Sequence, residues 1–253
     1  MKDLVSIILP VYNIEKYIAE TIDSILNQTF QNWELEITDD CSTDNTESII
    51  EKYAQFDSRI HYWKLPQNSG AGVARNNSIL KANGRYLAFI DGDDWWYPTK
   101  LEEQLKYMQE NALEFTCTYY EDTNETLKPY YIMKQPIRIG FKDMITGCSV
   151  GTPGVIIDTY YIGKMYMPNL RRAEDWGFWL EVLKKVDYLY TYPKVMWKYR
   201  HLPGSESSNK WKQLKAVVDM YQTVLNFSSL KAWTTCLFIF LPKNVWKKLR
   251  KSI

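Results

Sequence analysis

The sequence lacks several features that mark common classes of protein. No glycine occurs before Gly70, so no glycine-rich phosphate loop can follow the first predicted strand. This excludes P-loop kinases and dinucleotide-binding dehydrogenases. Gly70 and Gly72 do form a GxG, but Arg75 stands at the place of the third glycine. That GxG is therefore not a dinucleotide-binding motif.

Cysteine and histidine are also scarce. The four cysteines are far apart and form no CxxC pair, and only two histidines, His61 and His201, accompany them. The sequence therefore offers no zinc-ligand spacing. We expect reduced, buried thiols in a cytosolic protein.

Long apolar runs and an excess of charge are missing too. The first residues, MKDLVSIILPVYN, do not fit a signal peptide. The longest apolar stretch near the C-terminus, 236–241, is far below the roughly 20 residues of a spanning helix. Lys plus Arg number 31 and Asp plus Glu 30, so the net charge of +1 creates no overall field for nucleic acid. We expect no nucleic-acid partner and no membrane crossing.

What the sequence does contain is an alternation of strand and helix patterns. With 253 residues, 45% of them hydrophobic and 24% charged, the composition is that of a globular protein. Apolar runs predict strands, and apolar residues at helical spacing predict helices between them. The expected strands are 4–9, 34–38, 60–65 and 86–90, and the expected helices are 14–26, 43–56 and 73–82. This order predicts an α/β fold with a Rossmann-like, mostly parallel open sheet flanked by helices.

The pattern is weaker after about residue 113. Short strands are expected at 114–120, 155–158 and 188–192, and helices at 174–185 and 211–227. We interpret 113–210 as a smaller region on the same sheet and 211–253 as a C-terminal helical tail.

Three carboxylates directly follow the predicted strand 86–90. Asp91, Asp93 and Asp94 form the run Asp-Gly-Asp-Asp at the edge where open α/β sheets bind ligands. Carboxylates crowded within about 4 to 6 Å raise one another's pKa unless a cation intervenes. Oxygen ligands suit Mg²⁺ or Mn²⁺, so the run predicts a divalent-metal site with a phosphorylated ligand. The alternative is a turn in which Asp94 caps the next helix.

A second acidic group ends the predicted strand 34–38. Asp40 lies there, on the same edge of the sheet, and Tyr12 and Asn13 follow the first strand. An aromatic face, an amide and a carboxylate could hold a heterocyclic base by stacking and hydrogen bonding. Residues 42–44 are better explained as caps of the next helix.

Five motifs occur in the order in which one enzyme family has them. They are Val5 to Asn13 (VSIILPVYN), Ile25 to Phe30 (ILNQTF), Asp39 to Asp44 (DDCSTD), Asn68 to Asn76, and Asp91 to Asp94. On these motifs the chain resembles the family 2 glycosyltransferases, closely over about 4–110 and more loosely into the 170s. The resemblance implies a GT-A fold, a nucleotide-sugar donor, a divalent cation and inversion at the anomeric carbon.

The same resemblance implies roles in nucleotide binding. Asp40, with Tyr12, would bind the nucleobase, usually uracil, and Arg75 would lie along the nucleotide. Asp93 would lie near the ribose. Cys41 departs from the family, which commonly has glycine there, so the course of the backbone at that turn stays open.

The resemblance also implies a metal site and a catalytic base. Asp94, together with Asp93, would hold the Mg²⁺ or Mn²⁺ that bridges the diphosphate. Asp175 resembles the aspartate of the family's Glu-Asp pair and would take the acceptor proton. The alternative is that this pair only satisfies free N–H groups at a helix start. Arg200, ahead of a Ser-rich loop at 203–209, could add donors to the diphosphate, although an arginine beside a loop is more often solvated.

Residues 1–112 are therefore expected to bind the nucleotide sugar, and 113–210 the acceptor and the catalytic base. The tail alternates apolar residues with a basic cluster, so its stretch 233–251 is a candidate for contact with an anionic membrane surface, with packing on the main body as the alternative. The cluster consists of Lys243, Lys247, Lys248, Arg250 and Lys251. The expected location is the cytoplasm, with peripheral attachment to the inner face of the membrane.

We expect an inverting, metal-dependent hexosyltransferase that uses a nucleotide-diphosphate sugar, by preference a UDP-sugar. It would move a hexose or N-acetylhexosamine to a glycan or lipid-linked saccharide in polysaccharide biosynthesis, such as lipopolysaccharide or capsule assembly. Two alternatives stay open: a non-catalytic nucleotide-sugar-binding or scaffold protein on the same fold, and a sugar-phosphate nucleotidyltransferase.

Overall fold

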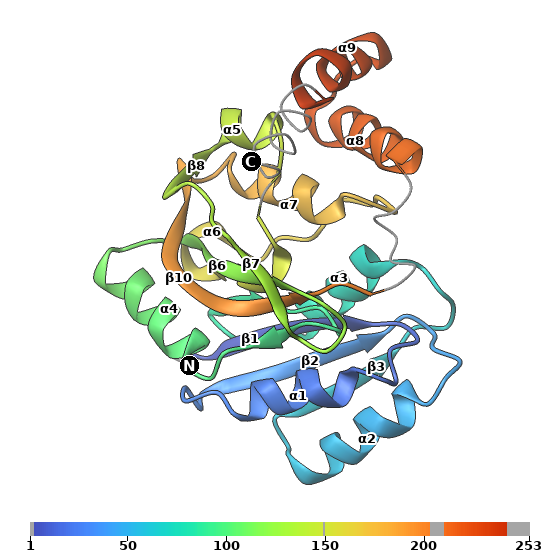
Figure 1. Cartoon of the computed structure of the whole chain (residues 1–253), viewed down its shortest axis with the longest axis vertical. Coiled ribbons are helices and arrows are strands. Elements are labelled where there is room, and N and C mark those ends of the chain that lie inside the picture. Colours follow the sequence, from blue (N-terminus) through green and yellow to red (C-terminus); the bar gives the residue numbers. More distant parts are fainter. Residues whose placement is uncertain (1–2, 149, 203–209, 242–253) are drawn as a thin grey trace.

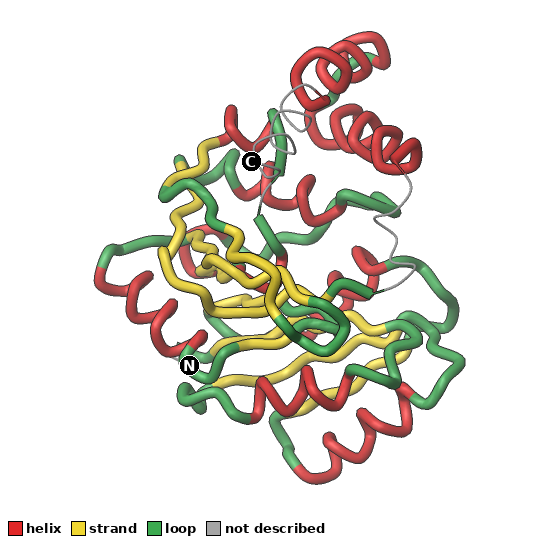
Figure 2. The backbone as a smooth tube through the Cα atoms, viewed as in Figure 1, coloured by secondary structure: helices red, strands yellow, loops and turns green. Residues whose placement is uncertain are grey.

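A computed structural model of the chain describes residues 3–148, 150–202 and 210–241. Its strands form one sheet in the order β3-β2-β1-β4-β9-β6-β10-β5, with β7 beside β6 and β8 beside β10 (Figures 1 and 2). The strands are β1 (Val5–Val11), β2 (Trp33–Asp39), β3 (Ile60–Lys64), β4 (Tyr86–Phe89), β5 (Trp95–Trp96), β6 (Phe115–Thr123), β7 (Pro129–Met133), β8 (Arg138–Gly140), β9 (Ile156–Asp158) and β10 (Tyr188–Arg200).

Helices pack on both faces of this sheet. The apolar side chains of α1, α2 and α4 share one core with one face of β1, β2 and β4, and those of α3 and α7 share another core with the opposite face of β1 and β4. Figure 1 shows α8 and α9 beyond α7, away from the sheet. The helices are α1 (Ile18–Leu26), α2 (Thr46–Phe56), α3 (Ala71–Lys81), α4 (Lys100–Glu110), α5 (Phe141–Ile145), the 3₁₀ turn η1 (Thr152–Gly154), α6 (Thr159–Ile162), α7 (Glu174–Val182), α8 (Lys210–Leu225), α9 (Ser229–Thr235) and the π-helical turn η3 (Cys236–Phe240).

The predicted α/β architecture is confirmed. Strand β1 is buried along its whole length because β2 and β4 flank it in parallel and helices cover both faces, which explains why all of its side chains except Ser6 are apolar. The sheet is mixed beyond β4, since β9 runs antiparallel to both β4 and β6. One sheet thus runs through both predicted halves of the chain.

Strand β10 is much longer than the predicted 188–192. Proline removes a ladder hydrogen bond, so Pro193 marks the end of a strand in sequence patterns. In the structure the pairing with β6 continues past Pro193 through register shifts between Tyr192 and Trp197, and the strand ends at Arg200. The end of the strand thus reaches the loop that contains the acidic run, where the Arg200 side chain donates to the backbone oxygen of Asp93.

The tail packs on the main body with one side only. Val217, Met220 and Tyr221 of α8 and Cys236 of η3 are buried in the core that contains α7. Other apolar side chains of the tail are exposed to solvent; they are Trp211, Leu230, Trp233, Leu237, Phe238 and Ile239. Residues 242–253, with the predicted basic cluster, and the loop 203–209 lie outside the described residues. No helix of the described part is long and apolar enough to cross a membrane.

Gly151, just before η1, allows this turn to pack closely against Trp197. A Cβ atom on Gly151 would lie 2.5 Å from Cη2 of the fully buried Trp197 ring. We expect Gly151→Ala to lower the free energy of unfolding by about 1 to 3 kcal/mol, because the overpacked ring cannot move aside. Urea unfolding followed by tryptophan fluorescence measures this loss.

Gly140→Ala is the matched control for this substitution. The added Cβ would meet its nearest atom, in Tyr188, at 3.4 Å, an ordinary contact, and Gly140 has a φ of −89°. Gly140→Ala should lower the free energy of unfolding by only about 0.5 kcal/mol, because alanine is a slightly poorer helix N-cap than glycine. Equal costs for both variants would contradict close packing at η1.

Candidate active site

A cleft of about 820 Å³ opens at the carboxyl ends of β1, β2 and β4. Its walls come from the loops after these strands, from the start of α3, from the segment leading into α7, and from the tail. The lining residues are Pro10, Val11, Tyr12, Ile14, Asp40, Asn68, Gly70, Ala71, Arg75, Asp91, Gly92, Asp93, Cys148, Arg171, Arg172, Ala173, Glu174, Trp176, Tyr199, Gln213, Ala216, Val217 and Phe240. The two predicted acidic groups therefore meet at one edge of the sheet.

Tyr12 and Asn13 differ in what they contribute. Tyr12 lines the cleft and is 48% exposed, so its ring face is open to a ligand. Asn13 is not among the lining residues: its side-chain oxygen accepts from the backbone N–H of Thr43 at 2.8 Å, and its backbone N–H donates to the Ser42 hydroxyl. Asn13 thus fastens the loop after β2 to the end of β1. Its contact with a nucleobase stays a prediction.

Asp40 lies in the cleft wall and is almost fully buried. Its two oxygens accept from the backbone N–H groups of Ser69, at 2.6 Å, and Gly70, at 2.7 Å. Each oxygen keeps one lone pair for a ligand. The neighbouring Cys41 has a φ of 67°, the left-handed conformation that glycine adopts without strain.

Arg75 is buried at the centre of the cleft wall. Its guanidinium donates to Asp91 Oδ1 at 2.5 Å and to Glu174 Oε1 at 2.8 Å. Burial alone would lower the pKa of Arg75, but the charges of Asp91, Glu174 and Asp175 raise it above its usual value. Arg75 thereby joins the acidic loop after β4 to the start of α7.

The acidic run divides into exposed and buried members. Asp91 and Asp93 line the cleft, whereas Asp94 is 0% exposed and does not line it. Asp94 Oδ1 accepts from the backbone N–H of Arg200 at 3.0 Å, and Oδ2 has no partner among the described residues. Asp93 is therefore the carboxylate of the predicted metal pair that reaches the cleft, and metal binding by Asp94 stays a prediction.

The electrostatics of this run fit a divalent cation. Burial and the charge of Asp91 raise the pKa of Asp93 to about 6. Burial and the charges of Asp93 and Asp91 also raise the pKa of Asp94 well above its usual value. Such repulsion is relieved when a cation binds among the oxygens, and all the candidate ligands are hard oxygen donors of the type that Mg²⁺ and Mn²⁺ prefer.

Arg200 lies behind the acidic run and not in the cleft. Its side chain is almost fully buried and donates to the backbone oxygens of Asp93 (2.7 Å) and Glu125 (2.6 Å) and to Glu20 Oε2 at 2.6 Å. Each guanidinium nitrogen is thus engaged within the protein. The structure gives Arg200 a positioning role for the loop 91–94, and its contact with a diphosphate stays a prediction.

Asp175 lies in the first turn of α7 and is not itself among the residues that line the cleft. Its Oδ1 accepts from the backbone N–H of Trp176 at 2.7 Å, and its Oδ2 accepts from the hydroxyl of the buried Thr152 at 3.0 Å. Glu174 and Trp176 line the cleft on either side of it in sequence. Burial raises the pKa of Glu174, the charge of Arg75 opposes this, and Asp175 adds to it.

Several cleft residues were absent from the sequence prediction. Arg171 and Arg172 could have been suspected from their place just before the Glu-Asp pair. Thr152 and the tail residues Val217 and Phe240 carry no local signal, because only the packing of distant segments brings them to the site.

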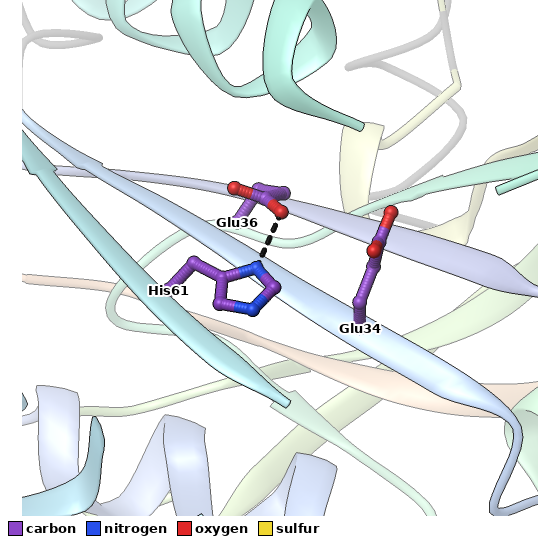
Figure 3. Close-up of side chains that lie close together, drawn as sticks. All are labelled: Glu34, Glu36 and His61. Atoms are coloured by element: carbon purple, nitrogen blue, oxygen red, sulfur yellow. Dashed lines mark hydrogen bonds and ion pairs between the residues drawn. The ribbon is translucent and has the colours of Figure 1, made fainter. Parts of the chain in front are cut away.

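A separate acidic group lies on β2 and β3, where possible metal-ligand atoms of Glu34, Glu36 and His61 are within 4.8 Å of one another (Figure 3). His61 Nδ1 is 2.6 Å from Glu36 Oε1, and the Trp63 indole donates to Glu36 Oε2. Glu34 accepts from the hydroxyl of Ser6 and from the backbone and side chain of Asn83. These hydrogen bonds account for the two buried carboxylates without a metal.

Comparison with known proteins gives consistent matches. A family model described as "Glycosyl transferase family 2" matches residues 6–164. The chain is 39% identical over 248 residues to TuaG of Bacillus subtilis, assigned as a teichuronic acid biosynthesis glycosyltransferase, with 98% of each chain covered. It is 36% identical over 219 residues to WfgD of Escherichia coli, a UDP-Glc:alpha-D-GlcNAc-diphosphoundecaprenol beta-1,3-glucosyltransferase, covering 86% of this chain and 85% of WfgD.

Solved structures share the fold. Staphylococcus aureus TarS (1–349) in complex with UDP-GlcNAc has a TM-score of 0.72 at 24% identity, over 91% of this chain and 69% of TarS. The mannosyltransferase PcManGT of Pyrobaculum calidifontis, in complex with GDP-Man and Mn²⁺, has a TM-score of 0.67 at 16% identity, over 92% of this chain and 68% of PcManGT. These likenesses confirm the GT-A architecture of the chain.

The raised pKa of Asp93 predicts a pH-dependent stability in the absence of divalent cations. Between about pH 4 and 6, folded Asp93 keeps a proton that the unfolded chain releases, so the free energy of unfolding should fall as pH rises through this window. Asp93→Asn should remove the part of this loss that Asp93 contributes, about 1 to 2 kcal/mol, whereas the part contributed by Asp94 remains. Urea unfolding in chelator at pH 4, 5, 6 and 7 measures it.

Added Mn²⁺ should restore stability above pH 6 in the wild type, because the cation favours the charged carboxylate. The Asp93→Asn variant should respond less. The same pH slope in both proteins would contradict the assignment of the proton to Asp93.

Proposed function

Because the chain belongs to glycosyl transferase family 2 and is a glycosyltransferase, we propose that it moves a hexose or N-acetylhexosamine from a UDP-sugar to a lipid-linked saccharide, with inversion at the anomeric carbon. One observation carries this proposal: the acidic run after β4 and the start of α7 line one cleft, where Arg75 joins Asp91 to Glu174. In this proposal the acidic run holds the cation that a donor diphosphate requires, and the start of α7 supplies a carboxylate for the acceptor hydroxyl. Polysaccharide biosynthesis is the context of the relatives.

The donor lies, in this proposal, along the walls that contain Tyr12, Asp40 and Arg75. Tyr12 stacks on the base, and Asp40, already fixed by two backbone donors, accepts from it. Asp93, with Asp91 beside it, would hold the Mg²⁺ or Mn²⁺. The cation supplies a Lewis acid for the charge that develops on the leaving diphosphate.

Asp175 is the proposed general base. Glu174 is less suited to this role because its carboxylate is engaged by Arg75. The Thr152 hydroxyl and the backbone N–H of Trp176 each donate to one oxygen of Asp175 and so fix the orientation of the carboxylate that would accept the proton of the acceptor hydroxyl. Arg200 supports the reaction indirectly by holding the loop that carries Asp93.

The lipid-linked acceptor suits the exposed apolar side chains of the tail. Leu230, Phe238 and Ile239 are at least 44% exposed, which is unusual for side chains of this size so close together in a chain. We propose that this surface contacts the inner face of the cytoplasmic membrane, where a lipid-linked acceptor would be held. Family membership favours transfer over the nucleotidyltransferase and scaffold alternatives.

A donor panel tests the proposed reaction. The protein is incubated with Mn²⁺ and UDP-glucose, UDP-GlcNAc, UDP-galactose or GDP-mannose, and the released nucleotide is quantified by chromatography. We expect UDP release from one UDP-sugar and its loss in chelator. Absence of release from every donor would contradict the proposed activity, and equal release in chelator would contradict the metal dependence.

Asp175→Asn should separate donor binding from transfer. The amide keeps the shape of the side chain but cannot accept the proton, so transfer should fall by about 10² to 10⁴. UDP affinity, measured by calorimetry, should stay near that of the wild type. Glu181→Gln, on the same helix but paired with Lys184 at the surface, is the control and should keep full activity. Wild-type turnover by Asp175→Asn would remove it as the base.

A further inference from the structure

The cleft has two chemically different ends. One is built from carboxylates and Arg75, as described above, and the other from apolar side chains that belong to α7, α8 and η3. Trp176, Ala216 and Val217 are at most 8% exposed, so the second end is a packed wall and not a loose surface. The proposed donor accounts only for the polar end.

The tail supplies most of this apolar wall. Gln213, Ala216 and Val217 stand at i, i+3 and i+4 on α8, which puts them on one helix face, and this face lines the cleft. The ring of Phe240 in η3 lies 5.5 Å from that of Trp176, at an interplanar angle of 36°. Phe240 therefore extends the aromatic surface of Trp176 along the cleft.

This wall begins directly beside the proposed base. Trp176 follows Asp175 in the first turn of α7, and its indole is held by a hydrogen bond to the backbone oxygen of Met144 at 2.8 Å. An acceptor hydroxyl at Asp175 thus brings the rest of the acceptor close to the apolar wall. Arg171 and Arg172 line the same cleft and add guanidinium groups, which bind phosphate oxygens well.

We propose that the apolar end is the acceptor subsite for the lipid part of a saccharide diphosphate carried on a long hydrocarbon chain. This inference rests on the proposed function and names the part of the site that selects the acceptor. A water-soluble glycan presents hydroxyl groups on most sides and gains little from an apolar wall, whereas a hydrocarbon chain gains free energy with each buried methylene group. The cationic pair in the same cleft complements the diphosphate.

Exposed apolar side chains stand close in sequence to this subsite. Leu237 and Phe238, in the same π-helical turn as Phe240, are 45% and 76% exposed. In this proposal a hydrocarbon chain that leaves the cleft past Phe240 continues onto this exposed apolar part of the tail. The subsite and the proposed membrane-contacting surface thus share one short segment of the protein.

The test compares two acceptors that carry the same saccharide diphosphate, one on a long alkyl chain and one on a methyl group, below the micelle concentration. We expect the wild type to have a kcat/KM at least about tenfold higher for the long-chain acceptor, since two buried methylenes already suffice for this factor. Phe240→Ala should reduce this preference to about twofold or less, and Phe240→Leu, which keeps an apolar wall, should retain most of it.

Phe56→Ala is the matched control. It removes the same ring at the end of α2, where Phe56 is 91% exposed and does not line the cleft, so the preference should stay at the wild-type value. Melting temperatures with and without UDP show whether each variant folds and binds donor. An unchanged preference in Phe240→Ala, or equal losses in both variants, would overturn the subsite. If the methyl acceptor is glycosylated as well as the long-chain one, the subsite fails and the proposed function stands; if neither is glycosylated, both fail.

Discussion

The buried ion pairs of Arg75 are the interaction on which the site depends. One guanidinium neutralises Asp91, in the loop after β4, and Glu174, at the start of α7, two segments that are far apart in sequence. A buried arginine with two carboxylates is costly to desolvate and is stable only when its partners are held in place. The sheet and the helices around it hold these partners in place, so the geometry of the cleft depends on the stability of the fold. The ion pair occupies the carboxylate of Glu174, and for this reason we propose Asp175 as the base.

Near Arg75, the carboxylates of the acidic run are not fully neutralised by the arginines around them. Asp93 and Asp94 repel Asp91 and one another, and Arg200 stabilises their loop mainly through backbone atoms. An excess of buried carboxylate is destabilising in the free protein and becomes favourable when a cation binds. Oδ2 of Asp94, which has no hydrogen-bond partner among the described residues, is part of this uncompensated negative charge. This imbalance supports the cation site that we propose.

The parts of the fold that sequence could predict are those governed by local pattern. The run Val5–Val11 is apolar except for Ser6 because both faces are covered, and the spacing of Ile18, Ile22 and Ile25 is typical of the helix that follows it. Long-range contacts were out of reach. Arg200 looked like a solvent-facing donor, yet packing turns its guanidinium toward Glu20 and two carbonyl groups. The extension of β10 past Pro193 depends on its pairing with β6, which no local pattern encodes.

The C-terminal tail also shows what the sequence pattern alone leaves open. Its apolar residues, together with a basic cluster, suggested either contact with a membrane surface or packing on the body, and in the described part buried and exposed apolar side chains are neighbours in one turn. Cys236 is buried in the core, Phe240 lines the cleft, and Phe238 is exposed to solvent. A π-helical turn points successive side chains to different surroundings, so these five residues contribute to the core, to the cleft wall and to the exposed surface. Because the same turn both anchors the tail and completes the cleft wall, the stability of the tail and the shape of the cleft are coupled. An acceptor bound at that wall would stabilise the tail against the body, and an anchored tail would in turn preform the wall.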